Sequence, residues 1–152
     1  MLRDFFTTGT STRLHYMLVK LFKAYDKNVP DWSTCIENFN ESANNNDIIK
    51  HHCPGFFVSH RAHLIKEVTT ILQRLNLKHA HLYMNVTTRS HGFGNHRDED
   101  DVYFWQCQGK TEWVIEDNTS YFLEPGDLIY IPKNVYHNVK TLTPRVGISM
   151  SM

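Results

Sequence analysis

Two short segments in the second half of the chain hold the side chains best suited to metal chemistry. The first, residues 92–98 (Gly-Phe-Gly-Asn-His-Arg-Asp), places an imidazole and a carboxylate two residues apart, and the second, residues 126–137, ends on His137. Residues i and i+2 of an extended segment point to the same side, so His96 and Asp98 are predicted to face one point in space. Two histidines and one carboxylate form the facial triad that holds Fe(II) and leaves coordination positions open.

Short strands are predicted to position these side chains. From Lys78 onward, apolar and polar residues alternate with a period of two, and turn signals such as Gly109-Lys110 and Pro125-Gly126 separate the runs. Strands at this spacing are typical of a sandwich or a small barrel. The aromatic residues of these runs are expected to fill its core, namely Phe104, Trp105 and Trp113. The expected strands cover residues 82–87, 102–108, 111–115, 127–131 and 145–151.

The first half of the chain is expected to form helices and loops. Apolar residues recur at three- and four-residue spacing between Thr12 and Lys27 and again from Ser59 to Leu75, which predicts two helices. A short helix is expected through Cys35 to Phe39. Residues 38–47 hold five asparagines and almost nothing apolar, which favours an exposed loop. Residues 1–78 are therefore expected to be a helical part that packs on a barrel of residues 79–152, together making one compact domain.

Composition excludes several classes of protein. Among the 152 residues, 16 Lys and Arg balance 16 Asp and Glu, so the overall charge footprint of a nucleic-acid binder is missing. A hydrophobic fraction of 41% is too high for a disordered chain. No apolar stretch approaches the ~18 residues needed to span a bilayer, and no long apolar region marks a secretory signal. Three cysteines without CxxC spacing argue against a disulfide framework, so a reducing, cytoplasmic location is expected.

The segment from about His81 to Met152 resembles the cupin superfamily. Residues 126–137 match the cupin pattern of Gly, five residues, Pro-x-Gly, two residues and His, with Asn134 in the place of the last glycine. Asn adopts a positive φ more readily than most residues, so this departure is mild. Asp98 stands where four-ligand cupins have a second histidine, which shifts the likeness to the JmjC-like and ribosomal-oxygenase cupins. The resemblance implies an α+β fold: a double-stranded β-helix (jelly-roll barrel) with N-terminal helices packed on one face.

The same resemblance implies an Fe(II)- and 2-oxoglutarate-dependent oxygenase that hydroxylates a protein side chain or a small molecule. His96, Asp98 and His137 would then be the metal ligands at the catalytic centre. In that family a Lys or Arg usually binds the distal carboxylate of 2-oxoglutarate at the position that Thr111 occupies here. The co-substrate site is therefore expected to contain Thr111 without the usual basic group.

Arg145 is the expected substitute for that basic group. Many other 2-oxoglutarate oxygenases of this barrel type place an arginine on a strand that follows the last histidine, and the run from His137 to Arg145 resembles that pattern. A guanidinium fork suits a carboxylate bidentately. Strand alternation gives Arg145 a polar, small-residue face, and Tyr83 and Asn85 are expected to supply neutral hydrogen bonds to the same ligand.

Two other classes of function stay open. One is a metal-dependent cupin enzyme that uses the triad without 2-oxoglutarate, which Thr111 favours. The other is a non-catalytic ligand-binding or interaction module, against which the complete triad argues. Substrate contacts are expected from the N-terminal helices and from loops such as residues 89–95. The protein is expected to be a monomer or a homodimer, with no membrane partner.

The remaining histidines are expected outside the metal site. His51 and His52 precede Cys53 in a segment whose Pro and Gly predict an irregular loop. His60 and His63 lie three residues apart and are expected on a helix surface. His81 shares a strand face with Tyr83 and is the one further histidine expected near the site.

Overall fold

Two antiparallel β-sheets face each other in the computed structural model, which describes residues 18–45 and 53–152. Within these residues, the larger sheet has the strand order β1-β7-β4-β9-β3-β2 and the smaller sheet has the order β6-β5-β8. The strands are β1 (Lys20–Phe22), β2 (Phe56–Ser59), β3 (His79–Asn85), β4 (Val102–Gln108), β5 (Thr111–Ile115), β6 (Ser120–Leu123), β7 (Leu128–Ile131), β8 (His137–Thr141) and β9 (Arg145–Ser151).

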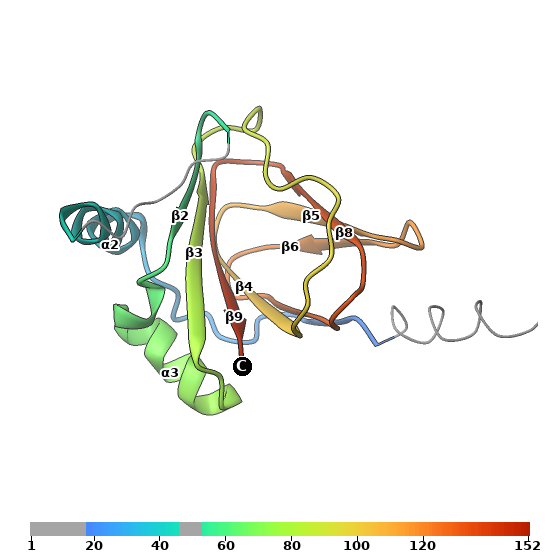
Figure 1. Cartoon of the computed structure of the whole chain (residues 1–152), viewed down its shortest axis with the longest axis horizontal. Coiled ribbons are helices and arrows are strands. Elements are labelled where there is room, and N and C mark those ends of the chain that lie inside the picture. The colour runs from blue at the N-terminus through green and yellow to red at the C-terminus, as the bar shows by residue number, and fades with distance from the viewer. Residues whose placement is uncertain (1–17, 46–52) are drawn as a thin grey trace, which may run out of the picture.

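Two α-helices cover the outer face of the larger sheet. They are α2 (Trp32–Asn44) and α3 (Lys66–Leu75), with a 3₁₀ turn η1 (Ala62–Leu64) before α3. Figure 1 shows both helices beside β2 and β3, on the side away from β5, β6 and β8. The fold expected from the sequence, an α+β barrel with helices on one face, is confirmed. In the part of the chain that the structure describes, no helix is long and apolar enough to cross a membrane.

The larger sheet separates two apolar cores. Its outer face packs against α3, where Val68 and Ile71 meet Leu82 of β3 and Ile148 of β9. Its inner face packs against the smaller sheet in a second core that includes Phe104, Trp113, Ile115, Leu123 and Ile129. Burying each large aliphatic side chain stabilises the fold by about 1.5–3 kcal/mol. The face of the sheet to which each side chain of β9 points is therefore strongly favoured. The same alternation sends Arg145 and Ser149 to the inner face.

Three strands coincide with their predicted bounds, residues 102–108, 111–115 and 145–151. The reversal between β4 and β5 depends on Gly109, which has a φ of +69°. A Cβ atom at this position would lie 2.0 Å from the carbonyl oxygen of Pro144, so no other residue fits the turn. The strand predicted at 127–131 begins one residue later, and the one predicted at 82–87 runs from His79 to Asn85.

The helix predicted from Thr12 to Lys27 is wrong over its described part, because Lys20–Phe22 form β1 at the edge of the larger sheet. The residues before Leu18 lie outside the described residues. Val19 and Leu21 alternate toward the second core, and main-chain pairing with β7 outweighs the helical spacing of the apolar residues.

The exposed loop predicted over residues 38–47 is also wrong, because α2 continues to Asn44. Asp31 caps its start by accepting a hydrogen bond from the Thr34 amide at 2.8 Å. Asn38 and Ser42 are buried, and Ser59 hydrogen-bonds to both. A polar residue inside the protein is tolerated when its hydrogen bonds are satisfied, which composition alone does not reveal. Residues 46 and 47 lie outside the described residues.

The second predicted helix begins later than expected. The segment from Phe56 to Ser59 is strand β2, paired with β3, and α3 starts only at Lys66. Val68, Ile71 and Leu72 are buried as predicted, whereas Leu64 is 52% exposed in the 3₁₀ turn before the helix. The first half of the chain therefore supplies two strands of the larger sheet in addition to its helices.

Candidate metal centre

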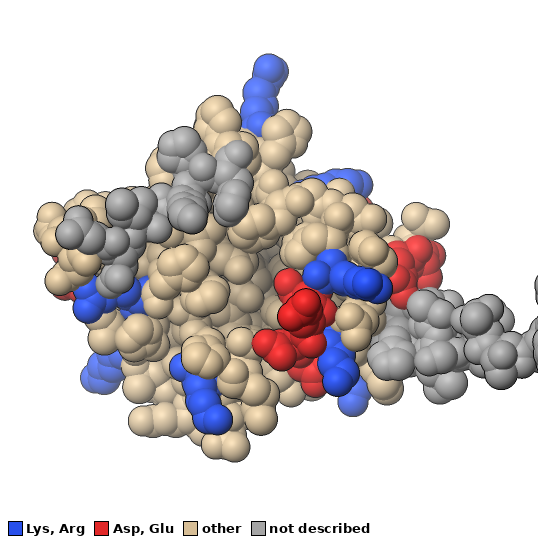
Figure 2. Space-filling model, in the orientation of Figure 1, with Lys and Arg blue, Asp and Glu red and all other residues tan. Residues whose placement is uncertain are grey.

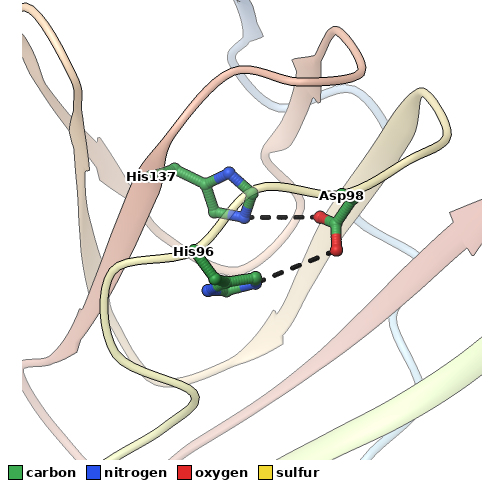
Figure 3. Close-up of side chains that lie close together, drawn as sticks. All are labelled: His96, Asp98 and His137. Atoms are coloured by element: carbon green, nitrogen blue, oxygen red, sulfur yellow. Dashed lines mark ion pairs between the residues drawn. The ribbon is translucent and has the colours of Figure 1, made fainter.

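The structure brings His96, Asp98 and His137 together at one end of the barrel. His96 and His137 exchange two main-chain hydrogen bonds, of 3.0 and 2.8 Å, which set their imidazole rings side by side with centroids 4.4 Å apart. Asp98 lies 3.9 Å from Nε2 of His96 and 3.5 Å from Nε2 of His137. Figure 3 shows the three side chains pointing toward one another, His137 from β8 and the other two from the loop before β4.

Main-chain carbonyl groups orient both imidazole rings. Nδ1 of His96 lies 2.9 Å from the carbonyl oxygen of Gly94, and Nδ1 of His137 lies 3.0 Å from that of Val135. A carbonyl oxygen only accepts, so each Nδ1 carries the proton and each Nε2 keeps its lone pair. Histidine ligands of metals are typically oriented in this way by a partner of their second nitrogen.

The donor atoms fit one metal ion. One ligand atom from each of the three side chains lies within 4.8 Å of the others. Metal bonds of about 2 Å keep the donors of one ion within about 4 Å of each other, so only a small adjustment is needed. Burial lowers the pKa of His137, and the neighbouring His96 lowers it further, which favours the neutral imidazole that binds metals.

The loop before β8 aims His137 at this point. Asn134 has a φ of 64°, the left-handed conformation expected for a residue in the glycine place of the motif. Its amide donates a 2.8 Å hydrogen bond to the carbonyl oxygen of Asp98, which ties the two ligand-bearing segments together. Trp113 of β5 stacks on the His137 ring, with centroids 5.4 Å apart.

A cavity of about 330 Å³ opens beside the triad, between the two sheets. Its walls are largely aromatic and include Phe56, Phe93, Phe104 and Trp113. The ring of Phe104 lies over Gly147, where a Cβ atom would come within 2.1 Å of it, so the absence of a side chain at this position makes room for the wall. Asp98 is 40% exposed, which leaves the triad accessible from the cavity mouth.

Arg145 points a buried cation into this cavity. Its Nε donates to Oδ1 of Asn85 at 2.6 Å, whereas Nη1 is buried with no partner among the described residues. The guanidinium carbon lies 5.9 Å from the ring centre of Phe56 and 5.6 Å from that of Phe104. Burial lowers the pKa of Arg145 to about 10, so the group is still charged at neutral pH. A buried charge without a counter-ion is costly, and an anionic ligand would remove that cost.

Tyr83 and Asn85 have different positions relative to the cavity. Tyr83 lines it together with Ser149, and burial raises the pKa of its hydroxyl. Asn85 is fully buried behind Arg145, and its Nδ2 donates to the Ser90 hydroxyl at 3.1 Å. Asn85 therefore holds Arg145 in place from the side away from the cavity.

Thr111 is not brought to the cavity. It is buried at the start of β5, where its hydroxyl donates to Oε1 of Gln106 at 2.9 Å. The neighbouring Lys110 is exposed and pairs with Glu124 at 2.6 Å. Arg145 is thus the basic residue that the described structure presents to the cavity.

Two aromatic residues of the cavity wall were not predicted from the sequence. Phe56 belongs to β2, a strand that the helical spacing of the first half concealed, and its role depends on pairing with β3. Phe93 contacts the rings of Phe56, Tyr83 and His96 at centroid distances of 5.1, 5.6 and 5.5 Å. The signal that could have identified Phe93 is its place between two glycines, three residues before His96.

A shallow polar groove adjoins the cavity mouth. His79 and His81 line one side of it and Glu99 and Asp100 line the other, with Tyr83 and Asp98 shared with the cavity. His81 therefore lies near the site, where its ring contacts His60 at 4.5 Å. Figure 2 shows acidic side chains gathered on this face, where the loop leads into β4.

The two facing sheets, with the triad at one end of the barrel, define a cupin fold. Residues 82–147 match the family model described as the cupin domain. Among solved structures, the chain is similar to the ribosomal oxygenase YcfD from Escherichia coli in complex with cobalt and 2-oxoglutarate. That likeness has a TM-score of 0.67 at 18% identity and covers 87% of this chain and 47% of YcfD.

Two further comparisons support the same fold. An X-ray structure of E. coli YcfD has a TM-score of 0.67 at 16% identity, over 99% of this chain and 54% of that one. A cupin superfamily protein from Desulfitobacterium hafniense DCB-2 has a TM-score of 0.50 at 10% identity, over 68% of this chain and 83% of that one. The chain thus spans about half the length of the YcfD chains. No curated protein matches it in sequence.

Proposed function

We propose that the protein is an Fe(II)- and 2-oxoglutarate-dependent oxygenase that hydroxylates a protein side chain or a small molecule. The observation that carries this proposal is Arg145, a buried cation without a counter-ion among the described residues, in the same cavity as the His-Asp-His triad. The triad alone suits many metal-dependent cupins. A guanidinium held beside it adds a receptor for a second carboxylate, which is the feature that distinguishes a dicarboxylate co-substrate.

Each group in the cavity has a role under this proposal. His96, Asp98 and His137 hold Fe(II), which supplies the redox chemistry with oxygen. Arg145 binds the distal carboxylate of 2-oxoglutarate, and Tyr83 is placed to add a neutral hydrogen bond. The aromatic walls exclude water from the reacting groups, which strengthens the charge interaction at the guanidinium. The likeness to YcfD, whose structure contains cobalt and 2-oxoglutarate, supports the same assignment.

An anaerobic titration with Fe(II) and then 2-oxoglutarate tests the proposal. The wild-type chain is expected to develop the weak visible charge-transfer band of 2-oxoglutarate chelated to Fe(II). Arg145→Ala is expected to bind Fe(II) normally but to lose about 30-fold or more in affinity for 2-oxoglutarate, because truncating one partner of a buried charge pair costs at least about 2 kcal/mol. Lys110→Ala is the matched control, since that cation is exposed. Equal 2-oxoglutarate affinity in wild type and Arg145→Ala would contradict the proposal.

A second candidate is a metal-dependent cupin enzyme that does not use 2-oxoglutarate. It is favoured by Thr111, which stands at the usual anchor position and is directed to Gln106 instead of the cavity. Metal binding with no spectroscopic response to 2-oxoglutarate would select this candidate. Failure to bind any divalent metal would instead favour a non-catalytic ligand-binding module.

A further inference from the structure

A second groove of about 480 Å³ runs alongside the metal-binding end of the barrel. One side is the loop of residues 88–94, and the other side is the outer edge of β8, residues 138–141. The groove and the cavity share the wall formed by residues 92–94 and Val139. A molecule in the groove therefore lies directly beside the cavity.

The side of this groove that β8 forms is an unpaired strand edge. His137 exchanges its main-chain hydrogen bonds with His96. In an antiparallel ladder the hydrogen-bonding direction alternates along the strand, so Val139 and Thr141 direct their N–H and C=O groups to the same side as His137. Asn138 and Lys140 pair with β5 on the opposite side. Among the described residues, none hydrogen-bonds to the outer edge of β8 beyond His137.

The loop of residues 88–94, which forms the opposite wall, is held by hydrogen bonds and leaves room for the main chain of a bound peptide. Asn85 donates to the Ser90 hydroxyl at 3.1 Å and to the carbonyl oxygen of His91 at 3.3 Å, which anchors the loop. Gly92 and Gly94 have no side chain, and a Cβ atom added to either would meet nothing within 4 Å. Glycine at such positions allows close approach by another main chain.

Side-chain alternation connects the strand edge to the metal centre. Val139 faces inward, opposite Trp113, and lines the cavity on the same strand face as His137. A residue that pairs with Val139 from the groove directs its side chain to that same inner face. It would stand two strand positions from His137, or about 6.8 Å along β8. One side chain of an added strand therefore reaches the cavity, while its neighbours point away.

The geometry points to this groove as the binding site for an extended segment of a peptide substrate, added to β8 as a further β-strand with one side chain directed into the cavity. An unpaired row of main-chain donors and acceptors is complementary to another extended main chain, as in other cases of β-strand addition. The inference rests on the proposed oxygenase function and selects a protein substrate over a small molecule.

A library of random, N-acetylated and C-amidated hexapeptides tests this inference with the full chain, Fe(II), 2-oxoglutarate and oxygen. We expect mass spectrometry to find a subset of peptides with one added oxygen atom at a shared position. N-methylation of a reactive peptide is expected to abolish its oxidation only at alternate residues, because only these donate to β8. Addition of that peptide is expected to slow hydrogen exchange of the Val139 and Thr141 amides.

A pair of variants tests the strand edge from the protein side. Thr141→Pro removes one outward N–H without removing a bond to β5, and Thr141→Val is the matched control that keeps it. The KM for the peptide is expected to rise about fivefold in Thr141→Pro, the effect of one main-chain hydrogen bond, with no change in 2-oxoglutarate affinity. If Thr141→Pro fails to fold, the N-methylated peptides still decide, because they leave the protein unaltered.

The outcomes separate the inference from the function on which it rests. Binding of 2-oxoglutarate with slow, oxygen-dependent release of succinate but no oxidised peptide would overturn the peptide groove and leave the oxygenase standing. Oxidation that N-methylation leaves unchanged at every position would overturn it as well. Failure to bind 2-oxoglutarate would overturn both.

Discussion

At the scale of single residues, the candidate site is organised by what lies behind each functional group. The imidazoles of His96 and His137 are oriented by the carbonyl groups of Gly94 and Val135, and Arg145 is oriented by Asn85. These contacts limit the rotation of the side chains before any ligand binds. Such preorganisation lowers the entropic cost of binding, so changes behind the site are expected to affect ligand affinity.

Replacement of His137 by alanine is expected to abolish tight metal binding. Removing a residue that only orients a ligand typically lowers metal affinity by about 10–100-fold. The loss in His137→Ala should be larger, because a ligand itself is removed. His63→Ala is the control, since His63 is exposed on the 3₁₀ turn and does not belong to the group of candidate metal ligands. Calorimetric titration of both variants with Co(II) measures the difference. Similar affinities in the two variants would mean that the metal binds elsewhere.

Asn85 is predicted to act on 2-oxoglutarate through Arg145. Asn85→Ala should weaken 2-oxoglutarate binding by about tenfold or more while Fe(II) affinity stays unchanged, because loss of a hydrogen bond to a charged group costs about 1.5–3 kcal/mol. Asn85→Asp keeps the acceptor that receives the Arg145 hydrogen bond. It also supplies a carboxylate that competes for the guanidinium, so it should weaken 2-oxoglutarate binding further. Recovery of affinity in Asn85→Asp would indicate a purely structural role for Asn85.

At the scale of elements, the sequence predicted several strands whose alternation and turns are local, but β6 and β8 were not among them. Residues 102–108 and 111–115 flank a glycine turn, and this local turn signal marks where one strand ends and the next begins. Strands β1 and β2 were missed because they are three and four residues long and their apolar residues also fit a helical period. Their conformation is decided by pairing with β7 and β3, which are distant in sequence.

The same distinction between local signals and distant pairing applies to the residues of the candidate site. The triad and Arg145 could be identified because each lies in a motif of fixed local spacing. Phe56 and the true position of Thr111 could not, because both depend on which strand lies next to which. Asn85 was expected to hydrogen-bond to the ligand, and only the packed structure shows that it contacts Arg145 from behind.

At the scale of the whole molecule, the segment of residues 23–26 joins the N-terminal part of the described chain to the barrel. The amide of Asp26 donates to the carbonyl oxygen of Gly126 at 3.1 Å, and its own carbonyl oxygen accepts from Nε1 of Trp105 at 3.1 Å. Its carboxylate pairs with Arg74 of α3 at 3.0 Å. Contacts from β4, the turn before β7 and α3 thus converge on one short segment.

Asp127 completes this junction and should make its stability depend on pH. Its carboxylate accepts from the amides of Ala24 and Glu124, at 2.8 and 2.9 Å, and from Lys23. Burial raises the pKa of Asp127, but these three hydrogen bonds together outweigh burial and hold the pKa below its ordinary value of 3.8. A lowered pKa in the folded state means that the ionised carboxylate stabilises the fold above about pH 4, and that this contribution is lost as the pH falls through the folded-state value.

Asp127→Asn is therefore expected to lower the free energy of unfolding at pH 7 by about 1–3 kcal/mol, the cost of leaving buried donors poorly paired. The difference from wild type should shrink as the pH falls below about 4, because the wild-type carboxylate becomes protonated as well. Urea unfolding at pH 7, 5 and 3 measures this, with Asp100→Asn as the control, since Asp100 is exposed and should change stability little at any pH. A difference that stays constant with pH would show that Asp127 contributes through shape and not through its charge, and the junction would then depend on Asp26 and its neighbours alone.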